Sequence, residues 1–172
     1  MLSIQGVDTS DKFGFLDKYD RDTTILNSMM YDGILKAVGV SATILNGYSY
    51  KNPLGNMLFH STNRLLDGIE TVFFRFIHLE NYDMKVGYEE YPSVASPERN
   101  ICDYFMYPKE LDACLYEMDA IEGYYEEVDG DMTSLYEMMK YFGIERSVLD
   151  EKMKHLYEGA NRHGIYWIGG TI

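Results

Sequence analysis

Cysteines and basic residues are few in this chain of 172 residues, which has 2 Cys and 15 Lys and Arg against 28 Asp and Glu. Two cysteines cannot build the disulfide framework of a small secreted protein. Cys102 and Cys114 fall on apolar or border positions of expected helices, so we expect buried, reduced thiols. No apolar run is long enough for a membrane span, and Met1 is not followed by the basic and apolar regions of a signal peptide. These absences predict a cytoplasmic protein without a membrane segment.

Motifs of common catalytic and cofactor-binding sites are also missing. The chain has no glycine-rich dinucleotide-binding or phosphate-binding loop and no G-x-S-x-G motif. The two cysteines and the two C-terminal histidines are not spaced as zinc ligands, and residues 129–133 lack the glycine position and the bidentate Glu of a calcium loop. We therefore expect no metal, no cofactor and no catalytic residues. His60 and His78 lie on expected strands and could approach each other, which leaves an enzyme that uses one of them as an alternative.

The whole chain has a formal net charge of −13, and its acidic residues are concentrated in the second half. Residues 87–172 hold 18 of the 28 acids, and the stretch from Glu110 to Glu137 has ten acids and no Lys or Arg. A negative surface repels phosphate, which argues against direct binding of DNA or RNA. This surface either keeps the protein soluble or binds a basic protein partner. The candidate partner-binding residues are Glu122, Glu126, Glu127, Asp129 and Asp131.

A hydrophobic content of 46% predicts one folded domain over residues 1–172. Its first part, to about residue 95, has one expected helix and then a β-rich region. The helix begins near Thr23 or Thr24 and ends at Val38, before Gly39. The strongest strand covers residues 70–79, which are rich in β-branched and aromatic side chains. The other expected strands are 4–7, 43–48, 57–60 and 84–91.

From about residue 96 to residue 164 the pattern is helical. Helices are expected over 97–107 and 109–124, from about Thr133 to a cap at Gly143, and over 147–157. Gly123 and Asp129 with Gly130 mark a loop after the second helix. One apolar stripe of that helix contains Leu111, Leu115, Met118 and Ile121.

The apolar tail, residues 165–172, could pair as an edge strand or dock on the core. A mixed or antiparallel sheet followed by a helical bundle defines an α+β fold. No repeat or low-complexity linker divides the chain.

The clearest helix start lies at Ser96. Its hydroxyl can accept a hydrogen bond from a free amide of the first turn, Pro97 suits the first helical position, and Glu98 lies near the positive end of the helix dipole. We expect Arg99 to tie this helix to the sheet through an ion pair or backbone carbonyls. Glu98 and Arg99 could instead form an active-site pair.

The same region resembles part of a known family, over about residues 73–108. The pieces that carry the resemblance are Phe74-Arg75-Phe76-Ile77, Gly87-Tyr88-Glu89, Ala95-Ser96-Pro97-Glu98-Arg99 and Ile101-Cys102-Asp103-Tyr104. They are similar to an aromatic strand, a short glycine-containing strand, an Ala-Ser-Pro-Glu-Lys/Arg stretch and an apolar helix with an acidic residue in the AbiEi-type (type IV) antitoxin and transcriptional-regulator family. Pro53-Leu54-Gly55 also resembles a turn of that family. The motif residues are Ser96, Pro97, Glu98, Arg99 and Asp103.

Members of this family pair with a nucleotidyltransferase-like toxin, and they combine an N-terminal winged helix that represses their own operon with a C-terminal antitoxin domain. Residues 1–22 are too short for a winged helix, and no basic recognition helix follows. The resemblance therefore implies the antitoxin-like domain alone. We expect a non-enzymatic antitoxin of a toxin–antitoxin or phage-defence system that neutralises or regulates a protein partner. The alternative is an acidic inhibitor that binds the basic groove of a nuclease or another nucleic-acid enzyme.

Overall fold

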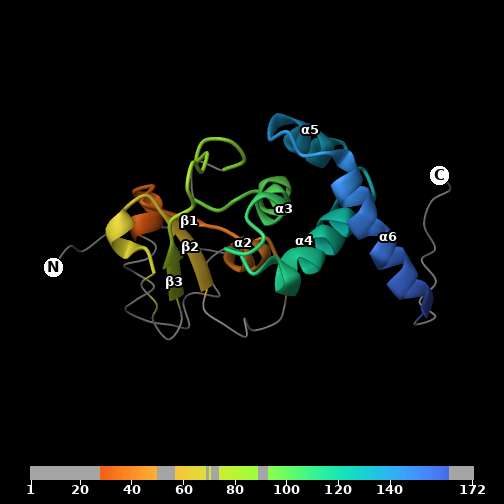
Figure 1. The fold of residues 1–172 in the computed structure, drawn as a ribbon, viewed down its shortest axis with the longest axis horizontal. Helices are drawn as coiled ribbons and strands as arrows, with labels where there is room; N and C mark the ends of the chain where they lie inside the picture. Colours follow the sequence, from red (N-terminus) through yellow and green to blue (C-terminus); the bar gives the residue numbers. More distant parts are fainter. Residues whose placement is uncertain (1–27, 50–56, 69, 71–73, 89–92, 163–172) are drawn as a thin grey trace.

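The computed structural model of the chain describes residues 28–49, 57–68, 70, 74–88 and 93–162, with side chains up to residue 154. A small sheet is followed along the chain by a group of helices (Figure 1), so the expected α+β class is confirmed. The strand expected at 4–7, the first residues of the helix expected from Thr23 and the apolar tail at 165–172 lie outside the described residues.

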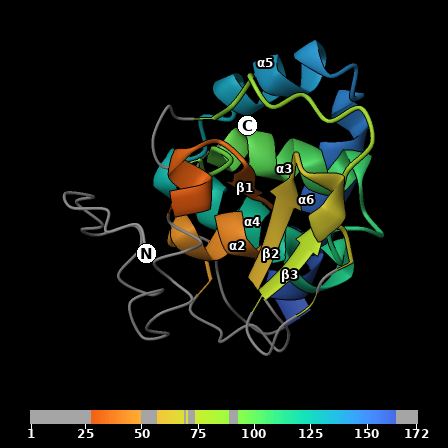
Figure 2. The same cartoon turned by 90° about the vertical axis from the view of Figure 1, so that its left-hand side faces the viewer.

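Three strands form a mixed sheet: β1 (Leu35–Ala37), β2 (Met57–Ser61) and β3 (Phe74–Ile77), in the order β1-β2-β3. β1 and β2 are antiparallel, with Lys36 opposite His60. β2 and β3 are parallel, as the two arrows in Figure 2 show. Val94 forms an isolated parallel bridge to Ala37, which brings the chain before Ser96 to the outer edge of β1.

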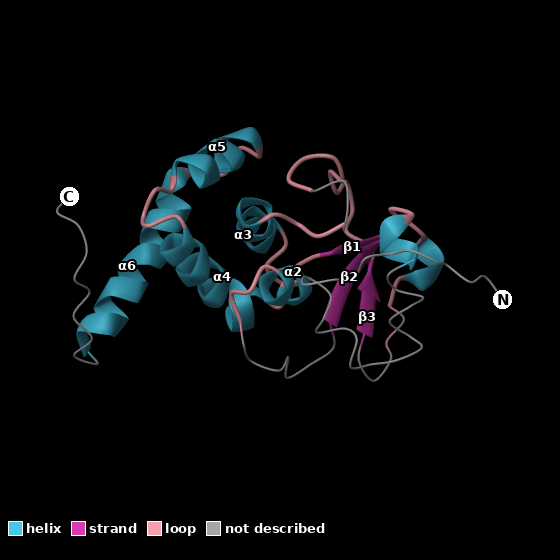
Figure 3. Ribbon diagram, turned by 180° about the vertical axis from the view of Figure 1, so that it is seen from behind, coloured by secondary structure: helices cyan, strands magenta, loops and turns pink. Residues whose placement is uncertain are grey.

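Successive residues of β2 point to two different cores, because side chains alternate across a strand. Phe59 packs with Phe74 and Phe76 on one face, at ring-centroid distances of 6.1 and 6.3 Å. Leu58 faces the helices that follow the sheet along the chain, and these helices lie to one side of the sheet in Figures 1 and 3. The sheet therefore separates a smaller aromatic core from a larger helical one.

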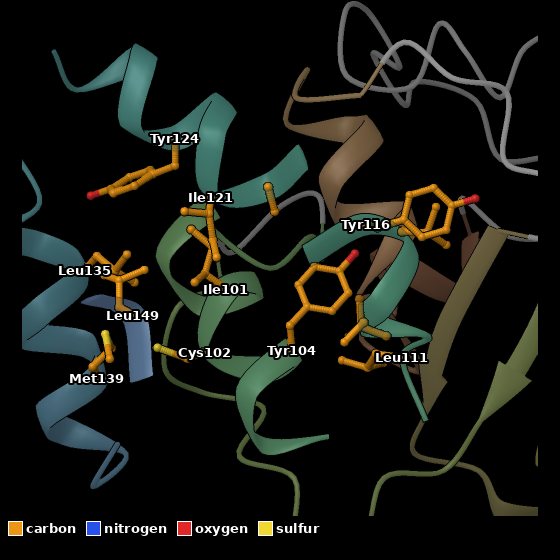
Figure 4. Close-up of a cluster of buried hydrophobic side chains, with 14 of the residues drawn as sticks. Ile101, Cys102, Tyr104, Leu111, Tyr116, Ile121, Tyr124, Leu135, Met139 and Leu149 are labelled. Carbon is orange, nitrogen blue, oxygen red and sulfur yellow. The ribbon is translucent and has the colours of Figure 1, made fainter. Parts of the chain in front are cut away.

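The labelled helices are α2 (Val40–Leu45), α3 (Pro97–Met106), α4 (Ala113–Glu127), α5 (Thr133–Tyr141) and α6 (Arg146–Arg162), with a 3-10 turn η2 (Arg64–Leu66). Residues 28–31 are also helical. α3 packs against both α4 and α5 and lies at the centre of the group. Figure 4 shows the larger core, which contains Ile101, Cys102, Tyr104, Leu111, Tyr116, Ile121, Tyr124, Leu135, Met139 and Leu149.

Two expectations for the first part of the chain are wrong. The helix expected to reach Val38 gives way to β1, because Gly33 turns the chain at φ +70° and Leu35 and Ala37 then alternate into the sheet. The strand expected over 43–48 is instead α2 and its end. The Thr43 hydroxyl donates to the carbonyl of Gly39 at 3.0 Å, a helix-type contact that offsets the β preference of its branched side chain.

The strand expected over 84–91 is absent among its described residues, which form a loop with one isolated bridge from Tyr88 to Ala95. The second C-terminal helix begins at Ala113 rather than at residue 109, after Asp112 adopts a left-handed conformation at φ +51°. Its buried stripe shifts accordingly, and Leu115 is 55% exposed. The stripe contains Ala113, Tyr116, Glu117, Ala120, Ile121 and Tyr124.

The remaining elements lie close to their expected positions: β2, the core of β3, α3, α5 and α6. Gly143 follows α5 at φ +68°, as expected for a residue that ends a helix. Within the described part of the chain, no helix has the length and apolar character needed to cross a bilayer.

Candidate functional site

Ser96 begins α3 as the sequence predicts. Its side-chain oxygen accepts a hydrogen bond from the amide of Arg99 at 3.3 Å, and Pro97 and Glu98 occupy the first turn. Glu98 also accepts a hydrogen bond from the Tyr124 hydroxyl at 3.1 Å, which links α3 to α4. Glu98 and Arg99 bind different partners. The Ser96-Pro97-Glu98 motif begins α3, and Glu98 also links α3 to α4.

Arg99 is buried and forms an ion pair within its own helix. Its Nε donates to Asp103 Oδ1 at 2.7 Å, and the two side chains are 1% and 0% exposed. Its Nη1 donates to the Val86 carbonyl at 2.8 Å. The ion pair and the backbone carbonyl are the types of contact expected for Arg99, but they do not tie α3 to the sheet. Asp103 lies on α3 itself, and the Val86 carbonyl belongs to a loop.

That loop, residues 79–88, is called the strap below, and it arches beside α3 in Figure 1. Tyr82 and Tyr88 of the strap lie against the Arg99 guanidinium, whose Cζ is 4.4 and 5.6 Å from their ring centroids. The Tyr82 hydroxyl donates to Asp103 and contacts the Tyr88 hydroxyl. Phe142, after α5, covers the guanidinium at 4.5 Å. The strap, α3 and the end of α5 thus enclose one cation.

Gly87 lets the strap approach α3 closely. Its carbonyl accepts a hydrogen bond from the amide of Ser96 at 2.7 Å, and a Cβ at this position would lie 2.4 Å from the Cβ of Arg99. Its φ of +75° is one that L residues rarely adopt. The glycine of the Gly87-Tyr88 motif piece is therefore required by packing against Arg99.

Burial shifts the pKa values of this cluster. It raises the pKa of Asp103 to about 6, although the charge of Arg99 and the hydroxyl of Tyr82 act in the opposite direction. It also raises the pKa values of Tyr82 and Tyr88 well above their ordinary value, so both hydroxyls stay neutral hydrogen-bond donors. The cluster holds one permanent cation and one carboxyl group whose pKa burial raises.

His60 and His78 meet as the sequence predicts, with ring centroids 5.5 Å apart. His60 Nδ1 accepts from the amide of Leu79 at 3.1 Å, and the Nδ1–H of His78 donates to the Ser61 carbonyl at 3.0 Å. Burial, with His78, Arg99 and Lys36 nearby, lowers the pKa of His60 to about 4. A neutral His60 with its ring 4.6 Å from Tyr82 and its nitrogen on a backbone amide serves packing beneath the strap.

The five candidate partner-binding acids lie together at one place, called the acidic corner below: the C-terminal half of α4 and the turn before α5. Every one of them is exposed. Within the described residues none forms an ion pair with Lys or Arg. Glu126 and Glu127 occupy the last turn of α4, at the negative end of the helix dipole, where acids are unfavourable and no basic residue compensates.

Two members of the acidic corner also have local structural roles. The Tyr48 hydroxyl donates to Glu127, and the Tyr48 ring packs on Gly123, where a Cβ would lie 2.7 Å from it. Asp131 accepts from the amide and hydroxyl of Thr133 at 3.1 and 2.6 Å, and these bonds, the hydroxyl first, lower the pKa of Asp131. Gly123 lies inside α4, so the loop expected there begins only after Glu127.

Two other acids of the 110–137 stretch form ion pairs with basic side chains. Asp112 pairs with Arg75 at 2.8 Å, and the largely buried Glu117 pairs with Lys152 at 2.7 Å. The fold thus separates the paired acids of this stretch, which hold elements together, from the exposed acids of the corner, a distinction that sequence alone does not indicate. Sequence reasoning also missed Tyr48 and Tyr82, whose partners Glu127 and Asp103 lie 79 and 21 residues further along the chain, and it included Tyr88 only as part of a motif piece.

The cysteine expectation is half right. Cys102 is buried in the larger core, where burial raises the pKa of its thiol to about 12, but Cys114 is exposed on α4. Cys114 lies in the first turn of α4, outside the stripe of residues that this helix buries. No group of three or more His, Cys, Asp or Glu side chains suited to a metal ion occurs in the part of the chain that the structure describes.

Comparison of the chain with protein-family models, with curated proteins and with solved structures found no match. The fold and the site define an α+β protein with a buried Arg99–Asp103 ion pair beside the strap and an exposed acidic corner.

Proposed function

We propose that this chain is a non-enzymatic, cytoplasmic antitoxin-like protein that neutralises a protein partner such as a nucleotidyltransferase-type toxin, and that it binds that partner through the acidic corner. The single observation that carries the proposal is the corner itself: five exposed acids without a basic counterpart among the described residues, two of them at the unfavourable end of a helix dipole. A basic surface on a partner would offset the repulsion among these acids and between them and the negative end of the α4 dipole.

Charge complementarity of this kind acts mainly on association rate and specificity. Enzymes that act on nucleotides or nucleic acids commonly present basic surfaces to phosphate, so an acidic corner suits that class of partner. The sequence resemblance to AbiEi-type antitoxins supports the same direction. Neither support requires the chain to bind DNA or RNA.

The experiment is co-expression with a nucleotidyltransferase-type toxin, with growth as the readout. The test variant is Glu122→Lys/Glu126→Lys/Asp129→Asn, because these three side chains form none of the hydrogen bonds described above. Asn is chosen at Asp129 because the residue has φ +49°, which Asn tolerates. The control variant, Glu137→Lys/Glu145→Lys/Glu151→Gln, makes the same change in net charge at exposed acids elsewhere.

The native chain and the control should restore growth, and the test variant should not. Growth inhibition that persists with the native chain would refute antitoxin action on that toxin. Rescue by all three chains would leave antitoxin action in place and remove the acidic corner as its binding surface.

A second candidate function rests on the same acidic corner, whose carboxylates could take the place of nucleic-acid phosphates on an enzyme. We propose as the alternative an acidic inhibitor that occupies the basic groove of a nuclease or another nucleic-acid enzyme. Inhibition in a purified assay should then weaken steeply with salt and disappear in the test variant but not in the control. Inhibition that is independent of salt and of the three acids would contradict this alternative.

A further inference from the structure

The end of α2 holds the one Asn-Gly pair of the sequence, Asn46-Gly47. In such a pair the backbone nitrogen of the glycine can attack the side-chain carbonyl carbon of the asparagine, because no side chain shields that nitrogen. A bond forms from the Gly47 nitrogen to Cγ of Asn46, the bond from Cγ to the side-chain nitrogen breaks, and ammonia leaves with the amide proton. Water then opens the succinimide ring at either carbonyl, which gives aspartate or isoaspartate.

The structure leaves space around this pair. Gly47 is exposed, Asn46 is half-buried, and a Cβ at Gly47 would meet nothing within 4 Å. Gly47 has φ +85°, as a glycine that ends a helix does. The end of α2 therefore explains the glycine, and no packed neighbour blocks its nitrogen.

Hydrogen bonds nevertheless hold both reacting groups in the folded chain. The amide of Gly47 donates to the Ile44 carbonyl at 2.9 Å, and Asn46 Nδ2 donates to the Ala95 carbonyl at 2.9 Å. Asn46 has helical angles, φ −81° and ψ −3°. Ring closure requires rotation about its Cα–C bond, which swings the Gly47 nitrogen toward the Asn46 side chain and away from the Ile44 carbonyl. The fold therefore slows the reaction by the free energy needed to release these contacts.

The bond from Asn46 to Ala95 also links two elements. Ala95 precedes Ser96, which begins α3, and the Ala95 amide donates to the carbonyl of Ala37 on β1 at 3.1 Å. Deamidation replaces the donor Nδ2 by a carboxylate oxygen, so an anion then faces the Ala95 carbonyl without a proton between them. The new charge also lies at the carbonyl end of α2, where a negative group is unfavourable.

We propose that Asn46-Gly47 is a deamidation site that the fold shields, and that its conversion to an acidic residue breaks the link between α2 and the entry of α3. The reaction needs only water as co-reactant and adds a negative charge. A chain that has been unfolded for a time carries this change after it refolds and is less stable because of it.

Peptide mass mapping of the full chain tests the shielding. The chain is incubated at mildly alkaline pH in native buffer and in guanidinium chloride above its unfolding midpoint. A peptide of residues 44–49 in the same two buffers is the unfolded reference. Conversion of residue 46 should match the peptide rate in denaturant and be at least about tenfold slower than the peptide rate in native buffer. The gain in mass separates deamidation from isomerisation of aspartate, which leaves the mass unchanged.

Two results overturn this part of the proposal. Equal rates for the folded chain and the peptide in native buffer show that the fold gives no shielding. A peptide and an unfolded chain that both stay unmodified at residue 46 show that the pair is not a deamidation site.

Two variants test the broken link. Asn46→Ala removes the donor, and Asn46→Asp removes it and adds the carboxylate. Both should lower the denaturant midpoint at pH 7, Asn46→Asp by more, and the amides of Ala95 and Ser96 should exchange hydrogen faster in Asn46→Asp. The excess loss in Asn46→Asp should shrink below about pH 4, where its carboxyl group is protonated and can donate to Ala95.

Equal midpoints of the two variants at every pH, or native exchange rates at Ala95 and Ser96, overturn the broken link. Chains deamidated in denaturant, separated by charge and refolded, make the comparison without a variant. If they unfold at the native midpoint, the conversion does not weaken the fold and the proposed consequence is wrong.

Discussion

Gly87 marks the closest approach between the strap and α3, and it predicts a specific cost for one added methyl group. Gly87→Ala should destabilise the protein by about 3 kcal/mol or more, because the Cβ would meet Arg99 at 2.4 Å and the φ of +75° is strained for Ala. Urea unfolding measures the loss. Gly68→Ala is the matched control, since Gly68 has φ +74° with nothing within 4 Å, and it should cost only about 1–2 kcal/mol. Equal losses would contradict the close contact with Arg99.

The buried ion pair predicts a second effect at a single residue. Arg99→Met leaves Asp103 without its cation in a site that is 0% exposed, so the free energy of unfolding at pH 7 should fall by about 3–5 kcal/mol. Arg64→Met removes a pair with Glu80 whose side chains are 69% and 66% exposed, and it should cost about 0–1 kcal/mol. Denaturant midpoints of the two variants compare the pairs directly. Similar midpoints would mean that losing the buried pair costs no more unfolding free energy than losing the exposed pair.

At the scale of elements, the residues that cap helix ends predicted those ends correctly. The Ser96-Pro97-Glu98 start of α3 and the glycine after α5 were predictable because capping depends on neighbours in sequence. The strand expected over 43–48 failed because β-branched residues favour strands only where tertiary packing permits, and here Thr43 bonds back to Gly39. The acidic corner was located in sequence, but its separation from the paired acids depends on long-range partners such as Arg75 and Lys152.

At Gly123, inside α4, the contact with Tyr48 opposes the higher helix propensity that Ala has over Gly. A helix-interior Gly→Ala change usually stabilises by about 1 kcal/mol. Here the added Cβ would lie 2.7 Å from Cβ and ring atoms of Tyr48, which are not the mobile end of that side chain, so Gly123→Ala should destabilise by about 1–3 kcal/mol. In a Tyr48→Ala background the same change should become neutral or stabilising. A double-mutant cycle on unfolding free energies measures the difference, and an additive cycle would rule out the packing of Tyr48 on Gly123.

For the whole molecule, the question is whether the two cores unfold together. Leu58 and Phe59, adjacent in β2, belong to opposite cores, and Ile44 and Tyr88 pack against both. This sharing predicts one cooperative unit, in agreement with the single domain expected from the sequence. Phe74 in the smaller core is 2% exposed and Ile101 in the larger core is 0% exposed, so truncating either removes fully buried contacts.

Phe74→Ala and Ile101→Ala should therefore each lower the free energy of unfolding by about 2–5 kcal/mol, and each should shift one and the same transition. Far-UV circular dichroism reports on the helices, and hydrogen exchange of β2 and β3 amides reports on the sheet. Leu65→Ala is the control, since Leu65 is 84% exposed and its loss should leave the midpoint nearly unchanged. If Phe74→Ala destabilised the sheet amides while the helical signal kept its native midpoint, the shared residues of β2 would not couple the cores, and the chain would contain two independently stable units.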